Sequence, residues 1–428
     1  MPRRDPARLP PIGEDGEVSR RSGPAAHPVL SATRLNRATL ARQLLLEPAG
    51  LDPVAAIEAV GGLQAQEPAS PYLALWTRLA AFDAAGLHAA FHDRTVIKAT
   101  LMRITLHAVS RRDYEQFLPA LLPMLRNTAR RDARGGSDAA RVARLAAATA
   151  DFASQPRTGV ELRDYISGLD ADTRLDEGLW WWVRRHLPLV HVPGKPPWAF
   201  SRRPVLTTSG AWLGDPELGG TGLDDPDGPA HAAGMQHLVR RYLAAFGPAT
   251  VRDVAAWSGA AVAQLRPAIA ALDAAGILRR FADDGGRELL DLEGAALPAA
   301  DVPAPPRLLP MWDNLLLAHA DRTRVISDAH RALVIARNGD VLPSFLVDGR
   351  VAGLWWAEPD GAASRIVLEP FAPLPREAGT ALESEAERLA AFVAPLDPAV
   401  FARYRGTRAR RHAGDGSNPA APPTRASL

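Results

Sequence analysis

The sequence predicts an α+β chain: three tandem winged-helix units, each a helix-turn-helix plus a β-hairpin, followed by a C-terminal small β-barrel-like domain. Helix-forming segments followed by two strand-forming runs occur three times, which is the order of elements in a winged helix. From Pro303 onward, short apolar runs alternate with Asn-Gly and Asp-Gly turns, which is typical of antiparallel strands. The length of 428 residues also favours several domains, at about 150 residues for each.

The first winged-helix unit is expected over residues 31–130. Its helices begin at residues that favour a helix start, and it ends with two alternating strands around a tight turn. The expected elements are helices over 37–46 with Asn36 as N-cap, over 54–60 after Pro53, and from Pro71, then strands over 95–100 and 103–109.

The second and third units are expected over residues 141–215 and 231–295. In each, helices precede two short runs that suit the strands of a wing. In the second unit these are helices over 158–166 and 179–187 and strands over 189–192 and 198–200. In the third they are helices over 236–246, 248–257 and 262–274, with a turn at Ser258-Gly259, and strands over 277–281 and 288–292.

The C-terminal β-domain is expected over residues 303–400. Five short strands at regular spacing suggest a small barrel or half-barrel. They are predicted over 324–326, 333–336, 341–347, 351–356 and 364–368, with a closing helix over 383–393. The two ends of the chain, a polar arm over 1–30 and a basic tail over 405–428, have no sustained periodicity and are predicted to be disordered.

Composition excludes several classes of protein. The absence of cysteine excludes disulfides, thiolate metal sites and a cysteine nucleophile. No apolar run is long enough to span a membrane, and the N-terminus lacks the apolar stretch of a secretory signal, so we expect a cytoplasmic protein. The formal charge is only +2, but nine cations oppose three anions between residues 94 and 134. Such a stretch indicates either a nucleic-acid surface or a solvated helix face.

A short segment after a double glycine carries the most informative motif. It reads Gly61-Gly62-Leu63-Gln64-Ala65-Gln66-Glu67-Pro68. Residues two apart in an extended segment point to the same side, so Gln64 and Gln66 would present two neutral amides together. In an arbitrary protein, two such glutamines are usually capping or surface residues, and the motif alone does not establish a function.

The motif and several other segments resemble the AlkZ-type bacterial DNA glycosylases, a family with three tandem winged helices and a C-terminal β-domain. The resemblance covers about residues 33–400, and one departure is Ile104, where a small residue such as Gly is commoner. The supporting segments are 101–107, 246–250, 308–319, 321–325 and 345–353. The family implies excision of bulky N7-alkylated purines from double-stranded DNA by Gln64 and Gln66, often for self-resistance to a DNA-alkylating antibiotic. We expect no cofactor or metal, because the chemistry does not need one and no cluster of His, Asp and Glu has ligand spacing.

Two amides suit that chemistry. Alkylation at N7 makes the purine cationic and therefore an activated leaving group, so little acid catalysis is needed. The remaining tasks are to position a water at C1′ and to stabilise an oxocarbenium-like sugar. A glutamine carbonyl can accept a hydrogen bond from that water while its NH₂ group is held elsewhere.

Other residues are candidates for DNA binding or for supporting the site. The candidates for DNA binding are Arg103, His107, Arg111, Arg112, Arg322 and Arg324. For the arginines the alternative is solvated surface charge, and for His107 it is a hydrogen-bonded core histidine. Asp313 and His319 are candidates for supporting the active site, although Asp313 could instead order the segment over 315–317.

The two lysines help to distinguish mechanisms. A glycosylase that also cleaves the strand needs an amine for a Schiff base, and the chain contains only Lys98, Lys195 and its α-amine. We therefore expect a monofunctional enzyme that leaves an abasic site. Three unequal units in one chain favour a monomer over the dimer that is usual for regulators. The alternatives are a non-catalytic winged-helix DNA-binding or regulatory protein and a resistance protein that shields DNA from a drug.

Overall fold

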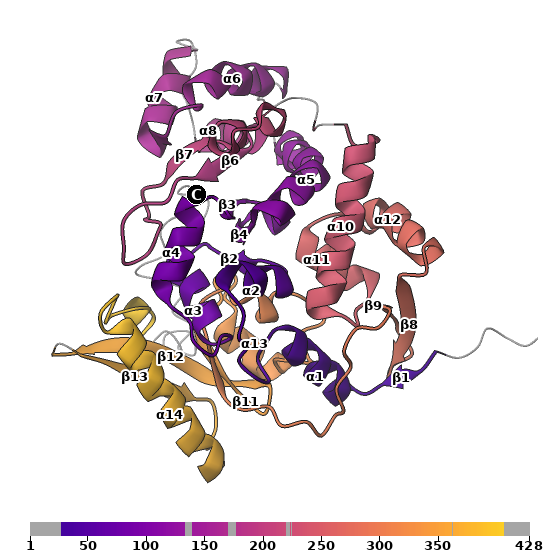
Figure 1. The fold of residues 1–428 in the computed structure, drawn as a ribbon, viewed down its shortest axis with the longest axis vertical. Helices are drawn as coiled ribbons and strands as arrows, with labels where there is room; N and C mark the ends of the chain where they lie inside the picture. Colours follow the sequence, from indigo (N-terminus) through magenta and orange to yellow (C-terminus); the bar gives the residue numbers. More distant parts are fainter. Residues whose placement is uncertain are drawn as a thin grey trace, which may run out of the picture.

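The computed structural model describes residues 27–132, 139–169, 177–219, 223, 225–361 and 363–405. It shows a mixed α+β chain with three β-sheets (Figure 1). Residues 1–26 of the expected disordered arm and residues 406–428 of the expected basic tail lie outside the described residues. Among the described residues, no helix is long and apolar enough to cross a membrane.

A six-stranded sheet combines strands from the first two expected units. Its order is β2-β4-β3-β6-β7-β5, so β2 is an edge strand. The bounds are β2 Leu63–Gln64, β3 Val96–Thr100, β4 Leu106–Ser110, β5 Arg157–Thr158, β6 Leu189–His191 and β7 Val205–Thr208. Ala99 of β3 lies opposite Val190 of β6, which joins the two expected wings into one sheet.

The expected strand over 198–200 is not formed. Prolines surround this segment and cannot donate to a strand ladder. The N–H of Ala199 donates instead to the hydroxyl of Tyr72, at 3.0 Å. The second strand of this wing therefore starts only at Val205.

Most helices of the first two units lie around this sheet. The helices of these units are α1 Ala32–Arg42, α2 Pro53–Ala59, α3 Ser70–Trp76, α4 Ala84–His92, α5 Arg111–Asp132, α6 Ala139–Phe152, α7 Gly159–Leu169, α8 Glu177–His186 and α9 Ser209–Leu213. Helix α1 packs instead against α10 (Pro229–Phe246) and the C-terminal region. The N-cap of α1 is Ser31 and not Asn36, because the Ser31 side chain accepts from the Arg34 N–H. Asn36 lies buried inside the helix and donates to the backbone oxygens of Arg324 and Gly349.

The third unit has a small sheet of its own. Its elements are α10 Pro229–Phe246, α11 Val251–Ser258, α12 Val262–Ala274, β8 Leu278–Asp283 and β9 Glu288–Leu292. A capping box between Thr250 and Asp253 starts α11, and Gly259 with φ +83° ends it. The strand β1 (Val29–Leu30) pairs in parallel with β8, so the last residues of the expected disordered arm are ordered. In Figure 1 the long helix α10 lies between this sheet and α5.

The C-terminal region is an open sheet with the order β10-β11-β12-β13, not the expected barrel. Its elements are β10 Arg307–Leu309, α13 Asp328–Val334, β11 Ser344–Val347, β12 Arg350–Asp360, β13 Ala363–Pro370 and α14 Arg376–Val393. Closure is not needed to bury its apolar face, because α14 and α3 pack there against residues such as Phe345 and Trp355. The expected strands over 324–326 and 333–336 are replaced by a loop and by α13, which Ser327 caps.

A buried ion pair joins the first unit to the C-terminal region. Arg78, two residues after α3, makes a bidentate contact with Asp313, with both N–O distances at 2.8 Å. Both side chains are fully buried. Arg78 also donates to the carbonyl oxygens of Ala74 and the Gln43 side chain. The pair therefore fixes how two regions that are far apart in sequence lie against each other.

We expect Arg78→Met to lower the free energy of unfolding by about 3–5 kcal/mol, because it leaves the Asp313 carboxylate buried without its counter-ion. Urea denaturation measures this loss. The double variant Arg78→Met/Asp313→Leu should recover much of it, whereas the exposed Arg252→Met should change stability by less than about 0.5 kcal/mol. Equal stability of Arg78→Met and the native chain would contradict the assigned role.

Candidate functional site

Two consecutive glycines set the position of the glutamine segment. Gly61 and Gly62 have φ of +75° and +88°, a region that favours glycine. A Cβ added at Gly62 would lie 2.8 Å from Cγ1 of Val109, so the close packing also requires glycine. The side-chain amide of Asn314 donates to the Gly62 carbonyl from the far side of the chain. The start of β2 is therefore held by both local conformation and a long-range contact.

The glutamine segment is the edge of the six-stranded sheet. In β2, Leu63 pairs with Ala108 and Gln64 with His107 of β4. The N–H of Ala65 continues the ladder by donating to the Leu106 carbonyl, at 2.8 Å. The strand ends at Gln64, and Gln66 and Glu67 lie in the bend that follows it. Glu67 is bound by Arg403 and lies near Lys98.

Both glutamine carbonyls are held by donors from β4 and the turn before it. Oε1 of Gln66 accepts from the Leu106 N–H at 2.8 Å, and Oε1 of Gln64 lies 3.3 Å from the Thr105 hydroxyl. No hydrogen bond holds either side-chain NH₂ group among the described residues. This arrangement is the reverse of the sequence expectation, in which protein groups held the NH₂. Each carbonyl oxygen still has a second lone pair that can accept from a water.

The turn between β3 and β4 is strained. Arg103 (φ 54°, ψ 17°) and Ile104 (φ 60°) occupy its central positions, and the Thr105 N–H donates to the Met102 carbonyl at 3.1 Å. This is a type I′ turn, which favours Asn-Gly. A β-branched residue in the left-handed region costs on the order of 1–3 kcal/mol.

The third unit holds the strained turn in place. The Arg103 guanidinium donates to the carbonyl of Trp257 in α11, at 2.6 Å. A Cβ at Gly259 would lie 3.2 Å from the backbone of Arg103, so glycine at the end of α11 permits this close approach. Helix α11 of the third unit thus packs against the turn beside the glutamines.

His107 is fully buried, as expected for the alternative of a hydrogen-bonded core histidine and not for a side chain on the DNA-binding surface. Its Nε2 lies 3.3 Å from the Arg103 guanidinium and its Nδ1 lies 3.0 Å from the Thr105 carbonyl. Because a guanidinium only donates and a carbonyl only accepts, the imidazole is neutral with its proton on Nδ1. Burial, with the Arg103 charge as a further cause, lowers the pKa of His107 to about 3. His107 therefore supports Arg103 and cannot act as an acid near neutral pH.

Arg103 and Arg322 lie near each other beside this turn. Burial, together with the neighbouring Arg322 charge, lowers the pKa of Arg103 to about 10. Arg322 is half-buried and donates to the His319 carbonyl at 3.4 Å. Among the described residues, neither guanidinium forms an ion pair with a carboxylate. Two neighbouring cations without a counter-ion form a suitable site for an anion such as a phosphate.

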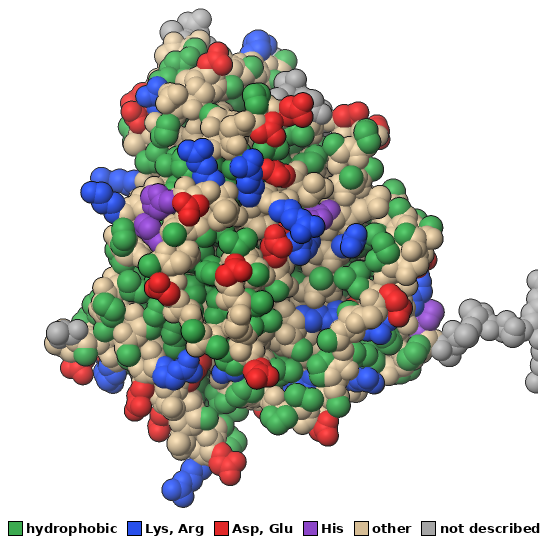
Figure 2. Space-filling view, in the orientation of Figure 1, with side chains coloured by type: hydrophobic (Ala, Val, Ile, Leu, Met, Phe, Trp, Pro, Cys, Tyr) green, Lys and Arg blue, Asp and Glu red, His purple; other side chains and the backbone are tan. Residues whose placement is uncertain are grey.

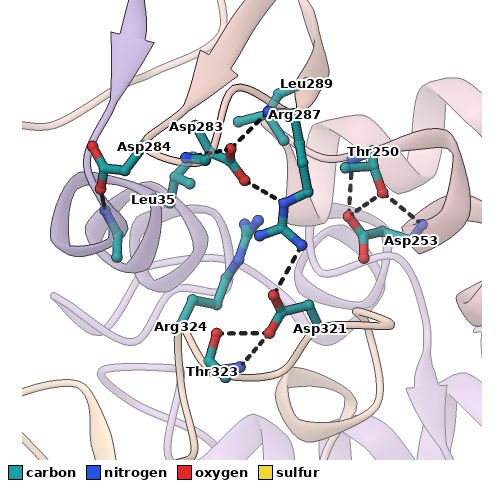
Figure 3. Close-up of a pocket in the computed structure, with 12 residues that line it drawn as sticks. Leu35, Thr250, Asp253, Asp283, Asp284, Arg287, Leu289, Asp321, Thr323 and Arg324 are labelled. Atoms are coloured by element: carbon teal, nitrogen blue, oxygen red, sulfur yellow. Dashed lines mark hydrogen bonds and ion pairs between the residues drawn. The ribbon is translucent and has the colours of Figure 1, made fainter.

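Arg324 lies in a different and more acidic environment. Its guanidinium donates to Thr39 Oγ1 at 3.3 Å and to the Pro248 carbonyl at 3.2 Å. Figure 3 shows it beside Arg287 in a pocket, where Arg287 bridges Asp283 and Asp321. Four aspartates and two arginines line this pocket, which gives a net negative charge. Arg324 is thus hydrogen-bonded to neighbouring segments and surrounded by more acidic than basic side chains in this pocket.

Arg111 and Arg112 lie away from the glutamines. They begin α5 directly after Ser110, which pairs with Val96 at the end of the hairpin opposite the turn. The five residue steps from Leu106 to Arg111 span about 17 Å along a strand. Arg111 pairs with Glu115, and Arg112 is exposed and makes no hydrogen bond or ion pair among the described residues. In Figure 2 cationic side chains form small groups with acidic side chains between them.

The two expected supporting residues are both buried. Asp313 pairs with Arg78 and accepts from the Leu315 N–H at 3.0 Å, so it also orders the segment after it. His319 lies 3.2 Å from the Phe246 carbonyl, and burial lowers its pKa to about 3. The sequence interpretation missed Arg78, Asn314 and Thr105, because each contacts a residue that is distant in sequence or is an ordinary turn residue.

Lys98 points away from the glutamines. It lies opposite Ala108, which lies opposite Leu63, so its side chain shares their face of the sheet and not the face of Gln64. Burial lowers its pKa to about 7, and Glu67 partly opposes this effect. Among the described residues, no group of three or more histidine or carboxylate side chains could hold a metal ion.

The buried histidines predict a loss of stability on mild acidification. The folded-state pKa values of His107 and His319 are about 3, below the usual 6.5. Between these two pH values the unfolded chain is protonated at both histidines, whereas the folded chain is not. From pH 6.5 down to about pH 5, each should lower the free energy of unfolding by roughly 1 kcal/mol per pH unit. Urea denaturation across this range tests this, and His107→Gln should reduce the slope. An unchanged slope in that variant would contradict the buried, neutral state.

Comparisons with known proteins agree with this architecture. The model of a family described as DNA glycosylase AlkZ-like matches residues 57–392. An interstrand DNA cross-link repair glycosylase of Streptomyces sahachiroi is 30% identical over 166 residues, 36% of this chain and 41% of that protein. The alignment thus spans about two fifths of that relative's length. The solved structure of Streptomyces sahachiroi DNA glycosylase AlkZ has the same fold, with a TM-score of 0.67 at 22% identity over 86% of this chain and 98% of that chain. The chain therefore belongs to the AlkZ-like DNA glycosylase family.

Proposed function

We propose that this protein is a monofunctional DNA glycosylase that hydrolyses the N-glycosidic bond of bulky N7-alkylated purines and leaves an abasic site. Family membership supports a DNA glycosylase. The name of the Streptomyces relative, an interstrand DNA cross-link repair glycosylase, supports a bulky lesion as the substrate. We also propose a role in self-resistance to a DNA-alkylating natural product.

The observation that carries the proposal is the oriented pair of glutamines on the edge strand. Leu106 N–H holds Gln66 at 2.8 Å and the Thr105 hydroxyl lies 3.3 Å from Gln64, so both amides have defined positions. Their remaining lone pairs can orient a water toward C1′, and their dipoles can stabilise the developing oxocarbenium ion. Glu67, the nearest carboxylate in sequence, is bound by Arg403 and lies near Lys98.

Weak bases are sufficient only for an activated leaving group. An N7-alkylated purine is cationic and departs as a neutral base, so no carboxylate is required to protonate it. An unmodified purine would need that protonation. Two neutral amides therefore favour alkylated purines and provide selectivity against undamaged DNA.

The position of the Lys98 side chain, on the sheet face away from Gln64, supports hydrolysis without strand cleavage. A lyase step requires an amine that attacks C1′ and forms a Schiff base. The Lys98 side chain is on the sheet face opposite Gln64 and is buried, and Lys195 is exposed on the loop between β6 and β7. A water oriented by Gln64 and Gln66 is then the nucleophile.

We propose that Arg103 and Arg322 bind a phosphate near the lesion and that Arg111 and Arg112 contact the backbone farther along the duplex. The missing carboxylate partners of Arg103 and Arg322 support this assignment. The three expected helix-turn-helix units would act as DNA-binding modules of one monomer on double-stranded DNA.

DNA bearing an N7-alkylguanine tests the proposed reaction. We expect the native chain to release the base and to leave an unbroken strand that breaks only after treatment with heat or base. Gln64→Ala and Gln66→Ala should each lower the single-turnover rate at least about 100-fold with little change in DNA affinity. The matched control is Gln116→Ala, an exposed glutamine on α5.

Three results would contradict the proposal. Full activity of the double variant Gln64→Ala/Gln66→Ala would exclude the glutamine site. Strand cleavage without heat or base would exclude a monofunctional enzyme. Tight binding of alkylated DNA without base release by the native chain would favour a non-catalytic DNA-binding or drug-shielding protein.

The salt dependence of DNA affinity tests the phosphate contacts. Each phosphate contact that is lost should reduce the slope of log affinity against log salt by about one. We expect this reduction for Arg322→Gln and Arg112→Gln. Arg324→Gln is the matched control, since its guanidinium is in the acidic pocket, and should leave the slope unchanged. A smaller salt slope for Arg324→Gln than for Arg322→Gln and Arg112→Gln would contradict the assigned phosphate contacts.

A further inference from the structure

The strained turn supplies the groups that orient both glutamines. Arg103 and Ile104 have φ of 54° and 60°, and the next two residues are Thr105 and Leu106. Thr105 provides the hydroxyl near Gln64, and Leu106 provides the N–H that binds Gln66. The conformation of the turn thus sets where both partners of the glutamine pair lie.

The two glutamines are held in different ways. A backbone N–H can only donate, so the Leu106 contact requires the oxygen of Gln66 at that position. A hydroxyl can donate or accept, so the Thr105 contact allows either end of the Gln64 amide to face it. Gln66 therefore has one orientation, whereas the orientation of Gln64 depends on the Thr105 proton.

The Thr105 proton has two possible acceptors. Oγ1 lies 3.0 Å from the Met102 carbonyl and 3.3 Å from Gln64 Oε1, but a hydroxyl has one hydrogen. When it donates to Gln64, the NH₂ group of Gln64 is left for the substrate. When the hydroxyl donates to the Met102 carbonyl, it can only accept from Gln64. The Gln64 amide is then flipped, so that Nε2 donates to Oγ1 and the carbonyl oxygen is left for a water.

We propose that Thr105 is a positioning residue of the glycosylase site, and that the strained turn holds its hydroxyl where it sets the orientation of the Gln64 amide. This inference rests on the proposed function. With Thr105 as donor, the Gln64 carbonyl keeps one lone pair for the attacking water, and in the reversed orientation both lone pairs are free for it. Thr105 itself need not touch the substrate.

The unfavourable backbone conformation at Ile104 also supports a positioning role for the turn. Ile104 is half-buried but belongs to none of the hydrophobic clusters of the described residues, so its packing does not explain its unfavourable φ. The turn is held from outside, by the Trp257 carbonyl and by the close approach of Gly259. Strain that neighbouring contacts maintain is typical of preorganised sites.

Threonine variants test the positioning role in the full-length protein on DNA bearing an N7-alkylguanine. Thr105→Val keeps the shape but removes the hydroxyl, and we expect a single-turnover rate about 10- to 100-fold lower with DNA affinity unchanged within about twofold. Thr105→Ser keeps the hydroxyl and should restore the rate to within about threefold of the native value. The matched control is Thr95→Val, whose hydroxyl donates to the Ala90 carbonyl at the other end of the hairpin.

A second variant separates positioning from stability. Ile104→Gly relieves the unfavourable φ but still allows the turn that places Thr105, so we expect a higher melting temperature with a single-turnover rate within about threefold of the native value. A lower rate in Thr105→Val can then be assigned to the lost hydroxyl and not to a change in stability. A native single-turnover rate in Thr105→Val would overturn the proposal.

Side-chain amide NMR keeps this test separate from the proposed function. If the native chain releases no base from alkylated DNA, the proposed function is wrong, but the Gln64 orientation can still be measured with selective ¹⁵N-glutamine labelling. We expect Thr105→Val, and not Thr105→Ser or Thr95→Val, to shift the Gln64 side-chain amide resonances while those of Gln66 stay in place. Unshifted Gln64 resonances in Thr105→Val would overturn the positioning role.

Discussion

The buried pair of Arg78 and Asp313 is the constraint on which the site depends. Two opposite charges without access to water are stable only together, so α3 and the segment after β10 cannot separate without exposing an unpaired charge. Arg78 also binds Gln43, which donates to the carbonyls of Val60 and Ala245. Next to Asp313, Asn314 donates to the Gly62 carbonyl. A single polar network thus runs from the C-terminal region to the glycines that begin the glutamine strand.

The electrostatic character of the site follows from what surrounds the edge strand. Gln64 and Gln66 are neutral, Lys98 lies on the sheet face away from Gln64, and His107 is kept neutral by burial. The cations nearest to the turn, Arg103 and Arg322, have no carboxylate partner among the described residues. The arrangement combines neutral amides with this pair of cations, which suits the proposed reaction, in which DNA supplies the phosphate and the modified base its own positive charge.

Contacts between the units place residues that are distant in sequence around the edge strand β2. The shared six-stranded sheet fixes the second unit against the first, and α11 of the third unit contacts the β3–β4 turn through Trp257 and Gly259. The Arg42–Asp291 pair joins α1 to β9 in the same way. Changes in the third unit can therefore reach the glutamines through the turn, without any contact with substrate.

Local signals in the sequence determined the elements whose ends are set by nearby residues. Pro53 and the double glycine mark α2 and the start of the glutamine segment, Gly259 marks the turn between α11 and α12, and alternation marks the β3–β4 hairpin. Tertiary structure decided the merging of two wings into one sheet, the open C-terminal sheet, the burial of His107 and the acidic surroundings of Arg324. Each of these depends on contacts between residues far apart in the chain, such as Arg78 with Asp313, and neither periodicity nor turn chemistry carries information about such contacts.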